Sequence, residues 1–207
     1  MSVDATAVTR TVGVTTEFKN FESGRAVRLP QRVAVIGQGN TASTFATTKF
    51  QSSSPAEIAT KYGYGSPLHL AALQLFPANG DGIGSVPVTF YPLDDASTGV
   101  AAVGSIAASG TQTATKEYIL KINNIKADSV VIAKDLTASA AITLFKNAID
   151  ATLKFPVTAG ENTGVETTLA VTSKWKGASA NDIIIEIDGE ESGIDFNNCY
   201  YLPEDVH

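Results

Sequence analysis

The clearest pattern of hydrophobic and polar positions lies between Thr137 and Asp188. It opens with an alanine-rich run in which large apolar residues recur every three or four positions, the spacing of one helical face. These residues are Ile142, Phe145, Ile149 and Leu153. Thr137 is placed to cap the start of a helix, and Pro156 follows its expected end. The pattern predicts a helix that packs one face against a core.

Two strand-like runs follow this helix. Residues 167–172 alternate apolar and polar positions, and residues 183–187 are almost entirely isoleucine. Residues 176–182 between them are rich in turn-forming types. We expect the two strands to pair and to complete a sheet that is covered by a helix on one face.

The first half of the chain contains two helix starts of the same type. Ser54 followed by Pro55 predicts an N-cap and a proline at the first helical position, and Glu57 is placed to close a capping box. Ser66 followed by Pro67 repeats the signal. The two helices are expected to end at Gly63 and at Pro77, and to cover one face of a sheet.

Five further runs predict strands in the rest of the chain. Prolines in the second run place it near a sheet edge, and the pair Asn123-Asn124 predicts a tight turn after the fourth. The runs are residues 32–37, 86–92, 100–106, 117–122 and 129–133.

These elements predict a mixed α/β (α+β) fold, made of small sheet layers that are each covered by one or two helices. The turn-rich stretch from Leu93 to Gly99 marks an expected domain boundary. We expect an extended N-terminal arm over residues 1–20, a first αβ domain over 21–95, a second over 96–190, and a C-terminal tail over 191–207.

Composition narrows the classes of function. The chain has a net charge of −6 with its basic residues scattered, which disfavours a nucleic-acid partner. The single cysteine, Cys199, excludes an internal disulfide and a cysteine-based zinc site. There is no signal-peptide pattern and no apolar run of about 20 residues, so we expect a soluble protein with no membrane partner. Only 17% of residues are charged, which suits a subunit that hides much of its surface.

One stretch, Gly37-Gln38-Gly39-Asn40-Thr41-Ala42, matches a dinucleotide-binding fingerprint. That chemistry needs a helix to open at the glycines, so that its amides face the phosphates. Residues 41–54 have weak helical periodicity, and the next helix signal is at Pro55. A strand that ends in a glycine turn explains the same residues, and a nucleotide-binding enzyme that uses Gly37-Gln38-Gly39 is kept as an alternative.

The other candidates for chemistry have simpler interpretations. His69 lacks a second ligand at metal-binding spacing, and residues 78–84 lack the glutamate of a calcium loop. Four aspartates lie at turns or strand ends, where turn-forming roles are expected: Asp94, Asp95, Asp128 and Asp135. We therefore expect no catalytic, metal or cofactor site, and a protein that is not an enzyme.

The N-terminal segment has a tendency to form a strand but cannot cover its own backbone. It is either an edge strand at a frayed terminus or an arm that adds a strand to the sheet of a neighbouring subunit. The candidate inter-subunit strand consists of Thr11, Val12, Gly13, Val14, Thr15, Thr16, Glu17 and Phe18.

The order of motifs in the second half resembles that of a known family. The helix ends in Ala148-Ile149-Asp150-Ala151, and Phe155-Pro156-Val157-Thr158-Ala159 follows it. A threonine-rich strand then precedes a K-x-x-G-x-x-x-N-D-I motif that begins at Lys174. This arrangement resembles the contractile bacteriophage tail sheath proteins of the Mu-like family. The resemblance covers about Val12 to Asp188 and matches only the N-terminal and outer part of such a subunit.

The resemblance implies a structural subunit of the virion tail. Such subunits polymerise with themselves as six-fold rings in a helical stack around the tail tube and drive contraction during DNA delivery. The implied partners are the tail tube, baseplate and tail-terminator proteins, and assembly takes place in the host bacterial cytoplasm. Terminal arms link adjacent sheath subunits, which favours the arm interpretation of residues 11–18. Another tail or baseplate structural protein is the alternative, and the chain is either part of a longer polypeptide or a shortened relative.

Overall fold

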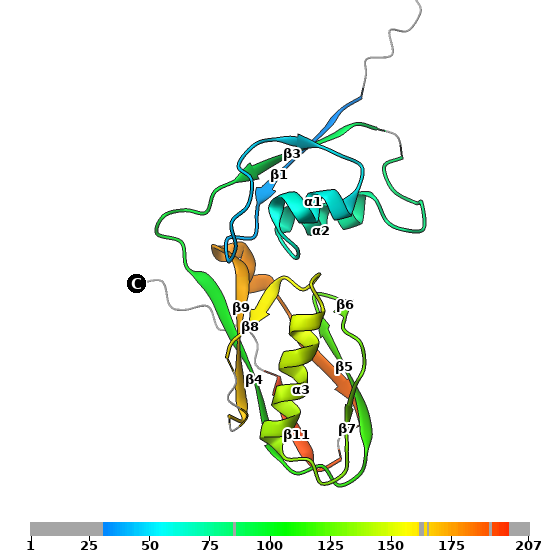
Figure 1. The fold of residues 1–207 in the computed structure, drawn as a ribbon, viewed down its shortest axis with the longest axis vertical. Helices are drawn as coiled ribbons and strands as arrows, with labels where there is room; N and C mark the ends of the chain where they lie inside the picture. Colours follow the sequence, from blue (N-terminus) through cyan, green and yellow to red (C-terminus); the bar gives the residue numbers. More distant parts are fainter. Residues whose placement is uncertain (1–30, 85, 162–163, 165, 191, 199–207) are drawn as a thin grey trace, which may run out of the picture. The chain divides into compact units, whose positions relative to one another are not determined.

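A computed structural model describes residues 31–84, 86–161, 164, 166–190 and 192–198. These residues have the mixed α/β fold that the sequence predicts, with small sheets and three α-helices in the described part (Figure 1). Within the compact unit of residues 32–207, the buried side chains form two hydrophobic cores.

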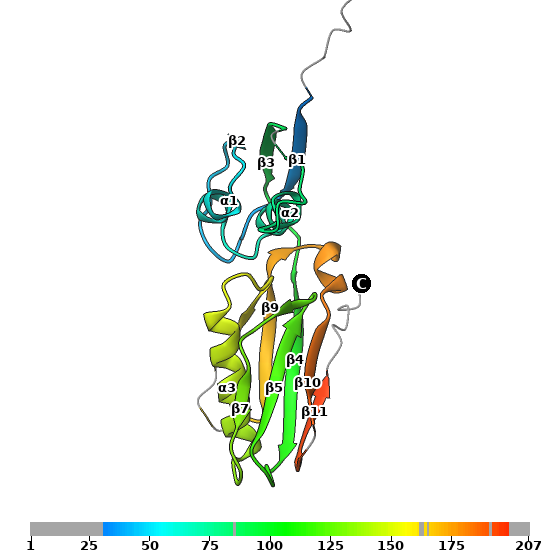
Figure 2. The same ribbon diagram turned by 90° about the vertical axis from the view of Figure 1, so that its right-hand side faces the viewer.

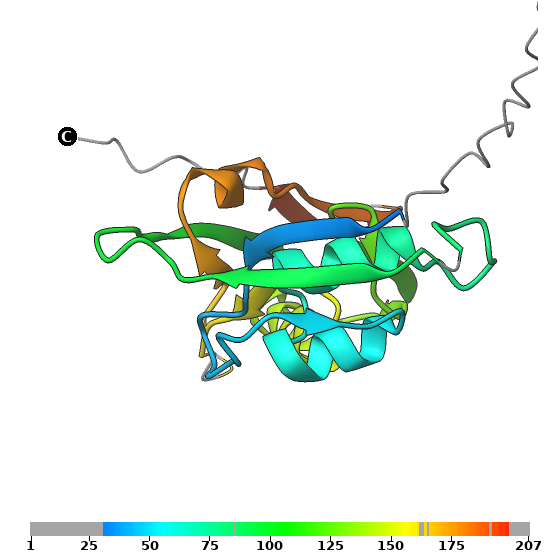
Figure 3. The same ribbon diagram turned by 90° about the horizontal axis from the view of Figure 1, so that it is seen from above.

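The first core lies between a small sheet and two helices. The strand order is β1-β3-β2, with β1 parallel to β3 and β2 antiparallel to it. Figure 3 shows β1 in blue beside β3 in green, with the two helices in cyan. The elements are β1 (Val33–Gln38), β2 (Phe50–Gln51), β3 (Val88–Leu93), α1 (Pro55–Tyr62) and α2 (Pro67–Leu75).

The helix starts are only partly as predicted. The side chain of Ser66 accepts a hydrogen bond from the amide of His69, which confirms the predicted cap of α2. The predicted capping box at α1 is wrong, because the Ser54 side chain makes no capping bond. Instead, the Ser52 hydroxyl donates to the Glu57 carboxylate at 2.6 Å and accepts from the Ser54 amide at 2.9 Å. The Glu57 side chain, which the capping box required, therefore bonds to Ser52 instead of to the helix start.

The predicted edge position of the proline-containing strand is also wrong. β3 is the middle strand of its sheet, between β1 and β2. The register explains how the proline is tolerated, because β2 pairs only with Thr89 and Phe90 and does not reach Pro92. Pro92 lies opposite Gly37 of β1 alone.

The second core is enclosed by two antiparallel sheets and one long helix, α3 (Ala138–Ala151). The Thr137 side chain accepts from the amide of Ala140, which confirms the predicted cap. In Figures 1 and 2, α3 runs lengthwise beside the strands of both sheets. One sheet has the order β11-β4-β9-β8, and the other has β10-β5-β6, with β7 also paired to β5.

The strands of the second core have these bounds. The first sheet contains β4 (Ala101–Gly110), β8 (Val157–Ala159), β9 (Thr168–Lys176) and β11 (Ile194–Asn198). The second contains β5 (Lys116–Ile122), β6 (Ile125–Lys126), β7 (Val130–Ile132) and β10 (Ile185–Gly189). Asn123 and Asn124 both have positive φ, at 49° and 64°, which suits the tight turn that was predicted between β5 and β6.

The predicted pairing of the two isoleucine- and threonine-rich strands is wrong. β9 already has β4 on one side and β8 on the other, so no edge is left for β10, which pairs with β5. The connection between them contains a short 3₁₀ helix, Ala178–Asp182, which carries the chain from one sheet to the other.

Two smaller expectations differ from the structure. Leu153 was expected on the buried face of α3, but the helix ends at Ala151 and Leu153 is 55% exposed. Residues 194–198, which were placed in the C-terminal tail, form β11 and pair with β4. Phe196 of β11 packs edge-on against Phe145, with ring centroids 5.1 Å apart, so this strand is part of the second core.

Candidate assembly surface

The sheet of β1, β3 and β2 presents one buried face and one exposed apolar face. Val88 and Phe90 of β3 point toward the helices and are 1% and 0% exposed. The alternate residues Ile36 of β1 and Tyr91 of β3 lie opposite each other in the register and are 65% and 38% exposed. Leu93, at the end of β3, is 49% exposed. We call Ile36, Tyr91 and Leu93 the apolar face.

The apolar face is unusual for parallel strands. Parallel strands almost always have both faces covered, because their connections place helices there. In this chain α1 and α2 cover one face of β1 and β3, and no other described element covers the second. Figure 3 looks onto this side of the two strands. Contiguous exposed apolar side chains of this type are typical of surfaces that contact another protein.

A shallow hollow of about 430 Å³ lies beside the short strand β2. Phe50 of β2 forms its apolar wall, and the Lys61 ammonium lies 4.9 Å from the centre of that ring. The remaining lining comes from α1, through Ala56, Glu57 and Thr60. Among the described strands, β2 pairs only with β3, so its other edge has no described partner. An edge strand beside an apolar hollow is the arrangement that receives an added strand, with a side chain in the hollow.

The predicted inter-subunit strand, Thr11 to Phe18, lies outside the described residues. Their role as an inter-subunit strand therefore stays a prediction.

A buried lysine joins the two αβ layers of the compact unit. Lys174 of β9 is 8% exposed, and its ammonium donates to the carbonyls of Tyr64 and Leu153, each at 3.1 Å. Its own carbonyl accepts from the Thr41 amide at 2.8 Å. Burial lowers the pKa of the Lys174 amine to about 8. No sequence motif assigned this role to Lys174, although its position beside Trp175 in a strand-forming run was a usable signal.

The side chain of His69 is buried. It is 3% exposed, and its Nδ1 accepts a hydrogen bond from the Gly65 amide at 2.9 Å. Burial and, to a smaller extent, the positive charges of Lys174 and Lys154 together lower the pKa of the imidazole to about 4. The imidazole is therefore neutral at ordinary pH and serves as a structural acceptor.

The aspartates lie in separate connections of the chain. Asp94 and Asp95 follow β3, Asp128 precedes β7, and Asp135 precedes α3 with a positive φ of 66°. Asp95 accepts from the Gln38 side chain at 2.6 Å and from the Lys176 amide at 3.1 Å. The contacts of Asp95 and the geometry of Asp135 are those of groups that fix turns and connections.

The fingerprint glycines do not open a helix. Residues 41–43 form a turn, and the next helix begins at Pro55. Gly39 packs on Phe45, because a Cβ at position 39 would lie 2.5 Å from the Phe45 ring. The Asn40 side chain accepts from the Ala42 amide at 3.0 Å and closes the turn. Side-chain packing therefore accounts for the glycine at position 39, and the geometry that a pyrophosphate needs is not formed there.

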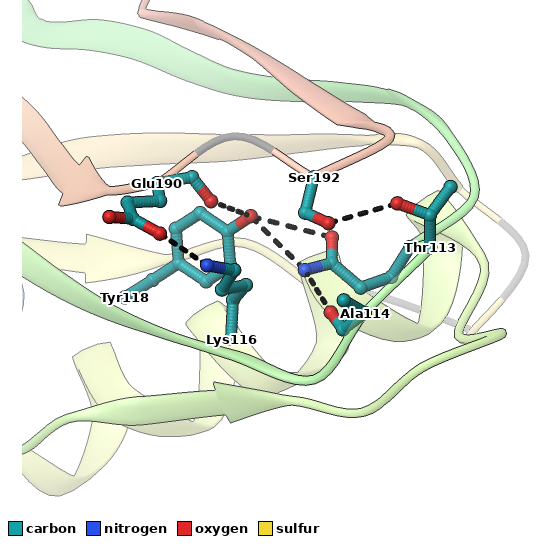
Figure 4. A network of polar contacts seen from close by, with 7 residues as sticks. Thr113, Ala114, Lys116, Tyr118, Glu190 and Ser192 are labelled. Atoms are coloured by element: carbon teal, nitrogen blue, oxygen red, sulfur yellow. Dashed lines mark hydrogen bonds and ion pairs between the residues drawn. The ribbon is translucent and has the colours of Figure 1, made fainter.

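A polar network fixes one end of the second core (Figure 4). The Tyr118 hydroxyl donates to the carbonyl of Glu190 at 3.1 Å, and the Thr113 and Ser192 hydroxyls lie 2.9 Å apart. Lys116 forms an ion pair with the Glu190 carboxylate. These contacts connect the β4–β5 turn to the residues between β10 and β11, so they have a structural role.

The described residues contain no group of three or more histidine, cysteine, aspartate or glutamate side chains that could hold a metal ion. In the glycine-rich loop that follows α2, Asn79 and Asp81 bond to each other, with the Asn79 amide 3.0 Å from the Asp81 carboxylate. Within the part of the chain that is described, no helix is long and apolar enough to cross a membrane.

No family model matches the chain, and a search of curated proteins finds no match.

Proposed function

We propose that this chain is a structural subunit of a contractile phage tail sheath. In this role it polymerises as hexameric rings around the tail tube and drives contraction during DNA delivery. It would reside in the virion tail, with the tube, baseplate and tail-terminator proteins as partners. The observation that carries the proposal is the incomplete first layer, made of β1, β2, β3, α1 and α2, whose apolar face and β2 edge have no partner among the described residues.

The first layer supports assembly because its apolar face is exposed and the outer edge of β2 has no described hydrogen-bonding partner. An unpaired strand edge and an exposed apolar sheet face both favour contact with another chain. In the proposed polymer, an arm from a neighbouring copy supplies residues 11–18 as a strand beside β2. An apolar side chain of that strand occupies the hollow against Phe50.

The second layer supports the proposal through its motif positions. The segments that carry the resemblance fold as α3, β8, β9, the 3₁₀ helix and β10, and all contribute buried residues to the second core. Lys174, the first residue of the K-x-x-G-x-x-x-N-D-I motif, donates to the carbonyl of Tyr64, between α1 and α2, and to the carbonyl of Leu153, after α3. A subunit that moves as a rigid body needs such a connection between its layers.

A peptide-binding experiment tests the proposed strand exchange. A fluorescent peptide with the sequence of residues 8–20 is titrated against the chain from which residues 1–20 have been deleted. We expect saturable binding that is at least 10-fold weaker for Thr60→Arg, because the arginine fills the hollow. Gln74→Arg, at an exposed position of α2, is the matched control and should bind as the parent does. Absence of binding, or equal binding by Thr60→Arg, would contradict the exchange.

A further inference from the structure

The sequence contains one Asn-Gly pair, Asn79-Gly80, in the loop between α2 and β3. In such a pair the backbone nitrogen of the glycine can attack the amide carbon of the asparagine side chain, because glycine has no side chain that obstructs the approach. The proposed function makes no use of this pair. Whether it reacts depends on the geometry of the folded loop.

The loop is fixed at its base and open at its tip. The Ile83 amide donates to the Leu75 carbonyl at 3.0 Å and closes the base. At the tip, Asn79, Gly80 and Asp81 are all exposed, and a Cβ at Gly80 would meet nothing within 4 Å. Water therefore reaches both reacting groups, and there is space for a new ring.

The Asn79 side chain is folded back over the peptide bond that follows it. The Asp81 amide donates to Asn79 Oδ1 at 3.4 Å, and Asn79 Nδ2 donates to the Asp81 carboxylate at 3.0 Å. An asparagine that accepts from the amide two residues later forms an Asx turn, which places its Cγ beside the nitrogen of the residue between them. That residue is Gly80. The Asp81 amide is also placed to stabilise the negative charge that develops on Oδ1 during attack.

A second hydrogen bond orients the attacking peptide. The Gly80 amide donates to the Pro77 carbonyl at 3.1 Å. This bond lies in the plane of the peptide, whereas the nitrogen attacks Cγ with electrons that are perpendicular to that plane. The bond therefore holds the peptide in position without obstructing the attack, and orientation of this kind lowers the barrier to reaction.

The described residues also contain two Asp-Gly pairs that could close the same ring, but their glycines are packed against other groups. A Cβ at Gly82 would lie 2.2 Å from the Leu75 carbonyl oxygen, and a Cβ at Gly189 would lie 2.3 Å from the Tyr118 ring. Neither position leaves room for a ring. The open space beside its glycine therefore distinguishes the Asn-Gly pair from these two.

We propose that Asn79 is a site of spontaneous deamidation in the folded chain. The Gly80 nitrogen forms a bond to Asn79 Cγ, the bond between Cγ and Nδ2 breaks, and the proton of the Gly80 amide leaves with Nδ2 as ammonia. The product is a five-membered succinimide ring. Water then opens one of the two bonds between the ring nitrogen and a ring carbonyl, which leaves an aspartyl or an isoaspartyl residue at position 79. No oxidant or reductant takes part.

The modification changes the contacts of the loop. The amide of Asn79 donates to the Asp81 carboxylate before the reaction, and a carboxylate that replaces it repels that group instead. An isoaspartyl residue also adds a methylene group to the backbone between α2 and β3. The loop therefore loses one of its fixing contacts as the protein ages. This proposal does not depend on the arm, on the β2 edge or on the sheath function.

Peptide mapping of the full chain after incubation in mildly alkaline buffer tests the site. Asn79 is the one asparagine in the tryptic peptide of residues 62–116, and fragmentation assigns a mass gain to it. The matched control is the tryptic peptide of residues 122–126, whose exposed turn asparagines, Asn123 and Asn124, have no glycine after them. We expect exchange of the amide for a carboxyl group about 10-fold or more faster at Asn79 than in the control. Methylation by an isoaspartyl methyltransferase detects the isoaspartyl product.

Two variants and a peptide separate the effect of the folded loop from that of the sequence. Gly80→Ala should slow the reaction about 10-fold, because its methyl group obstructs the attack. Gly84→Ala is the matched control, since Gly84 also has positive φ and open space around it, and it should leave the rate unchanged. The folded chain should react within about 10-fold of a synthetic peptide of residues 75–84, because the loop orients the reacting groups. Circular dichroism confirms that each variant is folded.

Four results would overturn the proposal. They are no mass gain at Asn79, equal rates in the two tryptic peptides, equal rates for Gly80→Ala and the parent chain, and a folded chain that reacts more than 10-fold slower than the synthetic peptide.

Discussion

At the scale of single residues, the side chains with the greatest structural effect are polar and buried. Lys174 and His69 both contact Tyr64. The Lys174 amine donates to the Tyr64 carbonyl, and the His69 ring packs edge-on against the Tyr64 ring, with ring centroids 5.5 Å apart. Sequence patterns could identify both residues as unusual but not their partners, because Lys174 and Tyr64 are 110 positions apart. Their burial shifts both pKa values, which makes their contributions measurable.

Replacing Lys174 with methionine should destabilise the chain by about 1–3 kcal/mol. The substitution keeps most of the apolar stem but leaves the carbonyls of Tyr64 and Leu153 without their shared donor. The free energy of unfolding, measured by urea denaturation, checks this. Lys176→Met on the same strand is the control, and an exposed position should change stability by less than about 0.5 kcal/mol. Equal effects of the two substitutions would refute the role of Lys174.

The low pKa of His69 predicts a loss of stability in acid. Its pKa is about 4 in the folded chain and 6.5 ordinarily, so the unfolded chain binds more protons between these values. Stability should therefore fall as the pH drops from 6.5 to 4. His69→Asn keeps an acceptor near Nδ1 but does not titrate, and its unfolding free energy should depend less on pH in this range. His207→Asn is the control, and a parallel decline in all three proteins would contradict the assignment.

At the scale of elements, the sequence predicts which segments form helices and strands better than it predicts how they pair. The caps at Ser66 and Thr137 depend on residues three positions away, so the local pattern contains the information. The central position of β3 and the separation of β9 from β10 depend on distant strands, which compete for the same edges. The apolar face was missed for a related reason. β1 and β3 carry apolar residues on both faces, which predicts burial without showing what covers the second face.

The apolar face predicts opposite effects for adjacent residues of β1. Ile36→Asp places a charge on the exposed side, so it should leave stability within about 0.5 kcal/mol and reduce assembly strongly. Val35→Asp, one residue earlier, places the charge against the first core and should unfold that layer. Light scattering reports assembly, and circular dichroism reports folding. If Ile36→Asp assembles like the parent chain, the apolar face is not a contact surface.

At the scale of the whole molecule, the described part of the chain has two well-packed cores and one incomplete surface. The polar groups with shifted pKa values serve structural contacts, and the fingerprint glycines end a strand. The incomplete surface belongs to the layer of β1, β2 and β3, which presents the apolar face and the β2 edge. These properties suit a subunit whose structure is completed by its neighbours, which is the basis of the proposed sheath function.

The most direct test of this account is electron microscopy of the purified chain, with and without residues 1–20, over a range of concentrations. The account predicts rings or stacked tubes with six-fold symmetry for the full chain. It predicts folded, unassembled protein for the deletion, with an unchanged circular dichroism spectrum over the α/β region. Normal assembly by the deleted chain, or a full chain that stays monomeric at every concentration, would contradict it.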